Sequence, residues 1–473
     1  MKNFNYEIWI ITLWLTCVLV SCERFVEIDT PIHKLDKETV FSNDETAISA
    51  INGIYNELVN STFSGGWNSS VTVLAGMSAD ILQPIRTTHS IFGPFNENEI
   101  SSSESPDASA NLNLWSSAYN IIYMANSILE GIENSNRITE ETKKTVEGQA
   151  HFIRAFTYFY LANLYGDVPL ILTTDYRRNA IAKRIPIDLI LDQVKTDLDI
   201  SMNLLNEVED YKNLERTNVN RFVVIAFYAR VSLFLKEWSK AEELSTKVIN
   251  QTGKYEILDD LNTVFLANSK EAIWQISPIG SNGGGTQTME GSIFIIHPTL
   301  PFISSIKLKD DFVSNINSND KRLTYWIGYH NRVESYYPHK YKDRNSINNI
   351  TEYSMVLRLA EQYLIRAEAR TKLNNLSGAI KDINVIRKRA GLLLISDTKS
   401  ELSKSELMDY IMYERKYELF SEWGHRWLDL KRTERASQVL KSIKPLWQDT
   451  DLFYPIPEEE RIKNPNLTQN DGY

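Results

Sequence analysis

Histidines and carboxylates are the residues of this chain best suited to acid–base or metal chemistry, but their spacing favours neither. No two of the seven histidines stand four residues apart, so no helix would present two of them to one metal ion. Acidic pairs such as Glu140–Glu141 and Asp310–Asp311 are typical of solvated helix surfaces. A glycosidase needs two carboxyl groups about 5–9 Å apart across a cleft, which spacing alone neither shows nor excludes. We therefore predict no catalytic residue and no metal site.

Known catalytic and cofactor motifs are also missing from the sequence. It holds no His-Glu-x-x-His, no phosphate-binding loop and no Gly-x-Ser-x-Gly. The glycines Gly283–Gly285 lack the spacing of a dinucleotide-binding turn. No ligand-spacing pattern points to calcium, so no cofactor is predicted.

Cys22 is the residue for which the sequence predicts a covalent reaction. It follows a basic Lys2, the apolar run Ile8–Val20 and a short Leu19-Val20-Ser21 segment. A run of this length is too short for a membrane span, which needs roughly 20 apolar residues, but it fits a signal peptide. We predict that residues 1–21 are removed and that the thiol of Cys22 is acylated, leaving residues 22–37 as a polar tether. The alternative is an ordinary secretory signal with a chance cysteine.

Composition and charge narrow the classes of partner. The chain is 42% hydrophobic and 24% charged, as globular proteins are, and its formal net charge is −10. An acidic balance disfavours nucleic acid and anionic membrane surfaces as partners. We therefore expect contact with a membrane through the lipid anchor only.

Helical spacing of apolar residues dominates the chain and predicts a mostly α fold. Ala229 and Ala241 are twelve residues apart, as are Ala367 and Ala379. In each case a helix with small residues precedes a short turn and a second amphipathic helix, which is the pattern of a tetratricopeptide-like repeat. The predicted helices are 44–59, 110–134, 139–165, 187–207, 220–235, 238–250, 352–372, 376–390 and 403–431.

Two segments interrupt this helical pattern. Residues 87–109 are rich in Ser, Asn and Pro and are predicted to form a surface excursion. Residues 255–349 contain turn clusters and two short strand-like pieces, 272–276 and 293–296. Long irregular segments on a rigid frame often carry binding sites, so a loop-rich binding face is expected.

Four stretches of sequence together carry a family resemblance. The first is Val40-Phe41 followed by Ala50–Tyr55. The second is Gly148–Leu161 followed by Leu164–Leu170, and the third is Arg415–Phe420 followed by Gly424–Arg432. The last is Tyr454–Pro457 with Asn464–Asn470 and Gly472-Tyr473. In order and in spacing, these stretches resemble the SusD/RagB family of outer-membrane nutrient-binding lipoproteins.

This resemblance implies a helical scaffold without catalysis. It implies a lipoprotein of the outer membrane that faces outward and sits on a SusC-like TonB-dependent transporter. Its cargo would be oligosaccharides, or in some members peptides. The resemblance also implies that residues 38–220 and 221–473 are two regions of one compact unit.

The signature residues themselves are expected to serve the fold. Arg154 is predicted to be a buried structural cation. Gly166 and Pro169, on either side of Asp167, are predicted to end a helix. Gly424 is predicted to lie in a turn between two helices, with Arg426 and Asp429 paired to each other.

Ligand contacts are expected instead from loop side chains, because aromatic rings stack on sugar faces and polar groups pair with hydroxyls. Trp67 is the leading candidate because an indole in a glycine-rich loop is hard to bury. Two alternatives remain beside peptide cargo: a glycan-cleaving enzyme, and a scaffold that only holds the transporter. The other candidates are His89, Phe92, Gln287, Trp326 and Tyr329.

Overall fold

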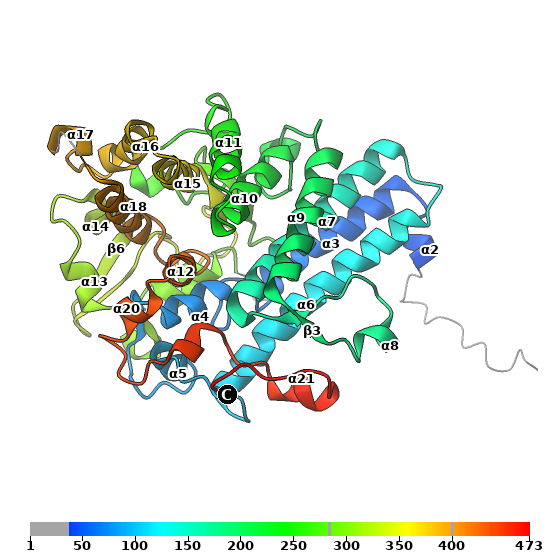
Figure 1. Cartoon of the computed structure of the whole chain (residues 1–473), viewed down its shortest axis with the longest axis horizontal. Helices are drawn as coiled ribbons and strands as arrows, with labels where there is room; N and C mark the ends of the chain where they lie inside the picture. Colours follow the sequence, from blue (N-terminus) through cyan, green and yellow to red (C-terminus); the bar gives the residue numbers. More distant parts are fainter. Residues whose placement is uncertain (1–36, 282–284, 399–401) are drawn as a thin grey trace, which may run out of the picture.

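Long helices stacked side by side form the frame of the molecule. The computed structural model describes residues 37–281, 285–398 and 402–473, so the predicted leader, Cys22 and nearly all of the tether lie outside the described residues. In Figure 1 these helices form two groups that follow one another along the stack. The first group is α3 (Asp44–Asn60), α6 (Pro106–Glu133), α7 (Glu140–Tyr165) and α9 (Ile187–Leu204). The second is α10 (Arg221–Phe234), α11 (Trp238–Ile249), α15 (Leu359–Lys372), α16 (Leu376–Arg389) and α18 (Lys404–Glu418).

Two helical hairpins in this stack have the predicted repeat geometry. Ala229 and Ala241, one on each helix of the α10–α11 hairpin, are fully buried, and so are Ala367 and Ala379 of the α15–α16 hairpin. The turns match as well, since Lys236 and its equivalent Asn374 both have left-handed backbones, with φ of 60° and 64°. Small side chains let the paired helices approach closely, and the mostly helical, tetratricopeptide-like fold class is confirmed.

Local signals in the sequence set the helix ends. Asn43 caps α3 by accepting a hydrogen bond from the backbone N–H of Thr46. Helix α7 ends at Tyr165, because Gly166 takes a positive φ of 73° that other residues rarely adopt. Gly424 is left-handed at the start of α19 (His425–Arg432) and makes the expected turn after α18.

The strands form four separate antiparallel pairs. They are β1 (Leu82–Pro84) with β5 (Ile306–Leu308), β2 (Val168–Pro169) with β3 (Arg184–Ile185), β4 (Ala272–Ile276) with β8 (Ser354–Arg358), and β6 (Ile327–His330) with β7 (Ser335–Pro338). The prediction of a strand at 272–276 is confirmed. The predicted helix 352–372 is wrong at its start, where β8 is buried on both faces and so shows no alternation.

Shorter helices fill the remaining connections. The predicted strand at 293–296 is wrong, since helix α12 covers Met289–Phe294. The expected excursion at 87–109 is only partly a surface loop, because α5 (Phe92–Glu97) buries Phe92 and Phe95. The others are α2 (Lys37–Val40), α4 (Val71–Ser78), α8 (Tyr176–Asn179), α13 (Asp310–Ser314), α14 (Lys321–Trp326), α17 (Ile395–Thr398), α20 (Ala436–Leu440) and α21 (Glu458–Lys463).

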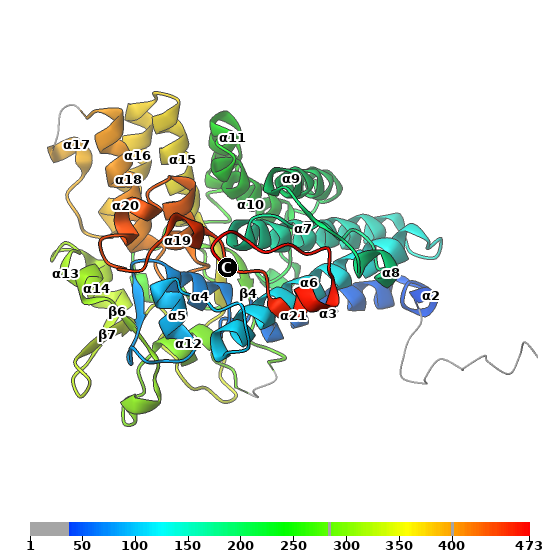
Figure 2. The ribbon, with the colours of Figure 1, turned by 60° about the horizontal axis from the view of Figure 1, so that its bottom comes forward.

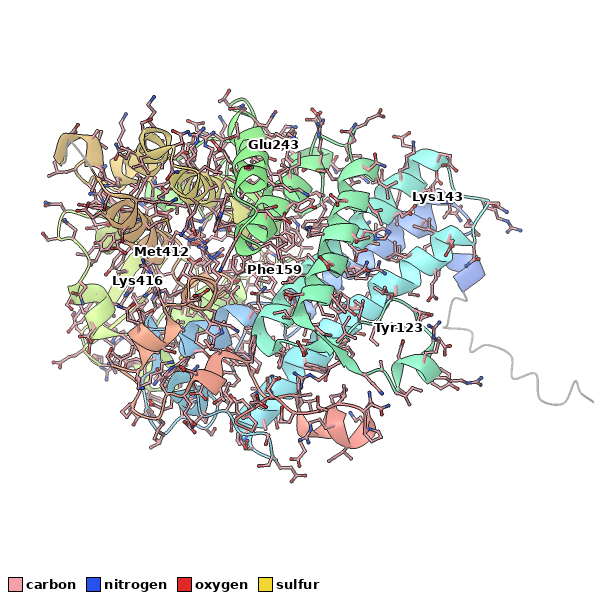
Figure 3. The ribbon with its side chains drawn as sticks, viewed as in Figure 1. Tyr123, Lys143, Phe159, Glu243, Met412 and Lys416 are labelled. Atoms are coloured by element: carbon pink, nitrogen blue, oxygen red, sulfur yellow. The ribbon has the colours of Figure 1, made fainter. Side chains whose placement is uncertain are left out.

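One extended core joins the two groups of helices. Phe159 of α7 is buried where α7 meets α10, with ring centroids 5.4 Å from Phe227 and 4.9 Å from Phe234 (Figure 3). Within the described part of the chain, no helix combines the length and apolarity that a membrane crossing requires.

A buried ionic network attaches the loop-rich segment to the helical frame. Arg322 of α14 pairs with Glu414 and Glu418 of α18, at 2.8 and 3.2 Å. Arg358, at the end of β8, also pairs with Glu418. Burial alone would raise the pKa of Glu418, but Arg389, Arg358 and Arg322 hold it well below its usual range. The frame therefore presents the loops from a fixed base.

Candidate functional site

Arg154 is a buried structural cation. Its Nε and Nη2 donate to the two oxygens of Asp197 on α9, at 2.9 and 2.7 Å, and Nη1 donates to Asn126 on α6 at 2.8 Å. This one side chain thus ties three helices together. The neighbouring signature residue Asp167 accepts a hydrogen bond from the backbone N–H of Ile187 at the start of α9.

The predicted pair between Arg426 and Asp429 is wrong. Arg426 instead donates to Asp80, with Nε–Oδ1 at 2.7 Å and Nη2–Oδ2 at 2.9 Å. Asp429 is held by Arg415 and Arg432, each at 2.7 Å. The reason is the packing of α19 on α4, which brings the buried Asp80 carboxylate, distant in sequence, within reach of Arg426.

Three loops meet on one side of the frame and form the main candidate site. We call residues 85–92, 295–305 and 327–338 the loop rim. Ile85 N donates to Ser305 O at 2.8 Å, and His330 Nε2 lies 3.2 Å from Pro298 O, so the middle loop contacts both others. Figure 2 shows α5, α12 and the β6–β7 hairpin gathered on the side below α15, α16 and α18.

The first loop of the rim is closed on itself by two predicted ligand residues. Phe92 is 1% exposed and its ring stacks on His89 at a centroid distance of 4.4 Å. His89 Nδ1 accepts the backbone N–H groups of Ile91 and Phe92, both at 3.2 Å. Burial and the nearby Arg86 lower the pKa of His89. The prediction that Phe92 contacts a ligand is therefore wrong, because its ring packs in the core. His89 is half-buried and remains a candidate.

The prediction that Trp326 contacts a ligand is also wrong. Its side chain is fully buried, and its indole N–H donates to Leu261 O at 2.9 Å. The ring lies close to the cationic groups of Lys340 and Arg389, at 4.7 and 5.4 Å from its centroid. As the last residue of α14, it packs inward under the ionic network. Tyr329, three residues later on β6, is 48% exposed and remains a candidate.

A second feature is a small void under the loop after α3. Gln287 lines this void, and Trp67 lies in the same loop, two residues after the lining residue Gly65. Trp67 is 46% exposed. The void measures about 10 Å³, room for roughly one water molecule, and Gln287, Glu290 and Ser354 help to line it. Burial raises the pKa of Glu290, whose Oε2 has no hydrogen-bond partner among the described residues. Gln287 Oε1 accepts from the backbone N–H of Ser346 at 2.9 Å.

Sequence reasoning missed an exposed apolar group in the middle loop of the rim. Leu300, Phe302 and Ile303 are 44%, 61% and 50% exposed. The signal was present as a short apolar run inside a polar, turn-rich segment. Large apolar side chains exposed together mark a contact surface more often than an isolated one does.

The rim combines exposed apolar surface with hydrogen-bond donors, which suits reversible binding. Phe302 and Tyr329 supply rings, and the exposed Arg86 and Arg332 lie in the first and third loops of the rim. Among the described residues, no group of three or more His, Cys, Asp or Glu is arranged to hold a metal ion.

Comparisons with known proteins match the whole length of the chain. The family model described as "SusD family" matches residues 313–473, and the one described as "Starch-binding associating with outer membrane" matches residues 78–233. SusD-like protein P2 of Formosa agariphila is 27% identical over 99% of this chain and all of its own. SusD-like protein P25 of the same organism is 25% identical over 98% of each chain.

Solved structures share the fold at low sequence identity. A SusD superfamily protein from Bacteroides vulgatus superposes with a TM-score of 0.79 at 19% identity, covering 92% of this chain and all of that one. Surface glycan-binding protein A from Bacteroides thetaiotaomicron, in complex with laminarihexaose, superposes with a TM-score of 0.74 at 18% identity, covering 90% and 99%.

Proposed function

Because the chain belongs to the SusD/RagB family, we propose that it captures oligosaccharides at the loop rim and passes them to a TonB-dependent outer-membrane transporter. The protein acts by binding, without catalysis and without a cofactor. Membership of the family supports the role in oligosaccharide capture, and the exposed side chains of the loop rim support the location of the binding site.

The exposed apolar group of the rim carries the assignment of the site. Phe302 is 61% exposed and Tyr329 is 48% exposed, on two loops joined by hydrogen bonds. A sugar ring presents a flat C–H face to such side chains and its hydroxyls to polar groups at the edge. The laminarihexaose complex of surface glycan-binding protein A shows that a protein of this fold binds a glycan.

Association with the outer membrane follows the same reasoning. The family description of residues 78–233 names that membrane, and the predicted acylation of Cys22 supplies the anchor. We propose that the protein faces the outside of the cell, where polymer fragments are available.

A glycan array followed by calorimetry tests the site. The full-length protein in mild detergent should bind at least one oligosaccharide, and Phe302→Ala with Tyr329→Ala should weaken that binding about tenfold or more. Tyr176→Ala is the matched control, because Tyr176 is 72% exposed but belongs to α8, away from the rim. If the protein bound peptides and no glycan, its cargo would be peptides and the proposal of glycan capture would be contradicted.

The transporter partner needs a separate test. Purification of this protein from detergent-solubilised outer membranes should recover a TonB-dependent transporter with it. Growth on the bound glycan should require both as well. Growth that persists without this protein would contradict its role in uptake.

A further inference from the structure

Three arginines on or beside the loop rim form no ion pair with a carboxylate among the described residues. Arg86 lies in the first loop of the rim, Arg332 lies in the β6–β7 turn, and Arg344 follows β7. Arg332 Nη1 donates to Thr299 O at 3.0 Å, and Arg344 Nε donates to Ile295 O at 3.0 Å. Arg86 lies next to Ile85, whose N–H donates to Ser305 O. Arg332 and Arg344 therefore contact segment 295–305 directly, and Arg86 directly follows a residue that is hydrogen-bonded to it.

Arginines of the helical frame are arranged differently. Arg154, Arg230 and Arg415 each pair with a buried carboxylate at 2.7 Å. Across the parts of the chain that the structure describes, Arg86, Arg332 and Arg344 form no ion pair. Burial alone lowers the pKa of Arg344, with no acidic group offsetting it.

Most guanidinium donors at the rim remain available to a ligand. A guanidinium has five N–H donors, and the side chains of Arg332 and Arg344 donate mainly to one main-chain carbonyl each. Carboxylates do occur close by in the sequence: Glu334 is exposed in the hairpin turn, and Asp343 directly precedes Arg344. Among the described residues, neither forms an ion pair with an arginine of this group.

We propose that the ligand of this rim is an anionic oligosaccharide, whose carboxylate or sulfate groups bind Arg86, Arg332 and Arg344. The planar, permanently charged guanidinium matches both oxyanions with paired hydrogen bonds. The exposed Phe302 and Tyr329 then contact the sugar rings between the charges. This inference rests on the proposed function and names the class of glycan.

Three probes of different charge test it: laminarihexaose, an oligogalacturonate and a carrageenan oligosaccharide. With the full-length protein in detergent, at least one of the two anionic probes should bind more tightly than laminarihexaose. Its affinity should fall steeply as NaCl is raised. The oligogalacturonate arm separates carboxylate recognition from sulfate recognition.

Substitutions of the arginines complete the test. Arg86→Gln should weaken the anionic probe about tenfold, since charged hydrogen bonds are worth this much, and the triple Gln variant should weaken it further. Arg86 is the safest single position, because its side chain makes no hydrogen bond to the described residues. Arg178→Gln is the control, since Arg178 is an exposed arginine on α8 at the far end of the molecule (Figure 1).

The outcomes separate this inference from the proposed function. Laminarihexaose binding at least as tightly as both anionic probes, with Arg86→Gln unchanged, would overturn the inference and leave glycan capture intact. Failure of all three probes to bind would count against both.

Discussion

Gly66 lies directly against the buried carboxyl group of Glu290. A β-carbon at position 66 would stand 2.5 Å from Glu290 Cδ and 2.6 Å from Oε2, and the φ of Gly66 is +76°. Only glycine meets both conditions, so the loop can settle on Glu290 and hold the adjacent Trp67 at the surface.

Gly66→Ala should therefore displace this loop. We expect a loss of about 1–2 kcal/mol in the free energy of unfolding, from backbone strain and steric clash. Gly53→Ala is the control, because nothing lies within 4 Å of a β-carbon there and the position is inside α3. That control should be neutral or slightly stabilising. Chemical denaturation measures both, and equal effects would contradict the account.

Trp67→Ala and Trp326→Ala should behave in opposite ways. Trp326 is fully buried, so its truncation should cost roughly 3–5 kcal/mol of stability. Trp67 is 46% exposed, so its truncation should leave the thermal midpoint nearly unchanged. If Trp67 meets the ligand, calorimetry will show weaker glycan binding for that variant. A large stability loss in Trp67→Ala would show that the ring serves the fold instead.

Arg426→Leu should destabilise the protein by roughly 3 kcal/mol, because it leaves the buried Asp80 carboxylate with Lys416 as its only remaining ion-pair partner in the described structure. The control is Arg435→Leu, which removes an exposed pair with Asp409 at 2.7 Å and should cost less than about 1 kcal/mol. Urea unfolding at neutral pH compares the two. Similar losses would mean that Asp80 is adequately held without Arg426.

Lys444 should make the free energy of unfolding depend on pH in the alkaline range. Its buried amino group donates to Ser78 O at 2.6 Å and to Asn98, and burial lowers its pKa well below the usual 10.5. Above the folded-state pKa and up to about 10.5, the unfolded chain keeps a proton that the folded chain has lost, so stability rises with pH. Across that range, the unfolding free energy of the wild type minus that of Lys444→Met should therefore rise with pH. A constant difference would show that folded Lys444 keeps its proton.

Cys22→Ala should separate anchoring from binding. We expect a folded, soluble protein that still binds its ligand but no longer supports uptake, because the substitution removes the thiol to which we propose the anchoring acyl chains are attached. Cell fractionation and calorimetry measure the two properties. Loss of binding would show that the anchor region belongs to the site.

The sequence by itself was sufficient for the helical frame. Periodic apolar residues, an N-cap such as Asn43 and a left-handed glycine such as Gly166 act within a few residues, so they can be read locally. The alanine pairs of the two repeat hairpins belong to the same class of signal. The family motifs could be recognised for the same reason.

Only the tertiary structure decided which side chains reach the surface and which charges meet. Trp67 and Trp326 both stood in irregular segments, yet one is exposed and the other is covered by Lys340 and Arg389. Arg426 could have paired with Asp429 within its own helix, yet it pairs with Asp80 from a distant part of the chain. Burial and ion pairing depend on contacts between remote segments, and local spacing carries no information about those contacts.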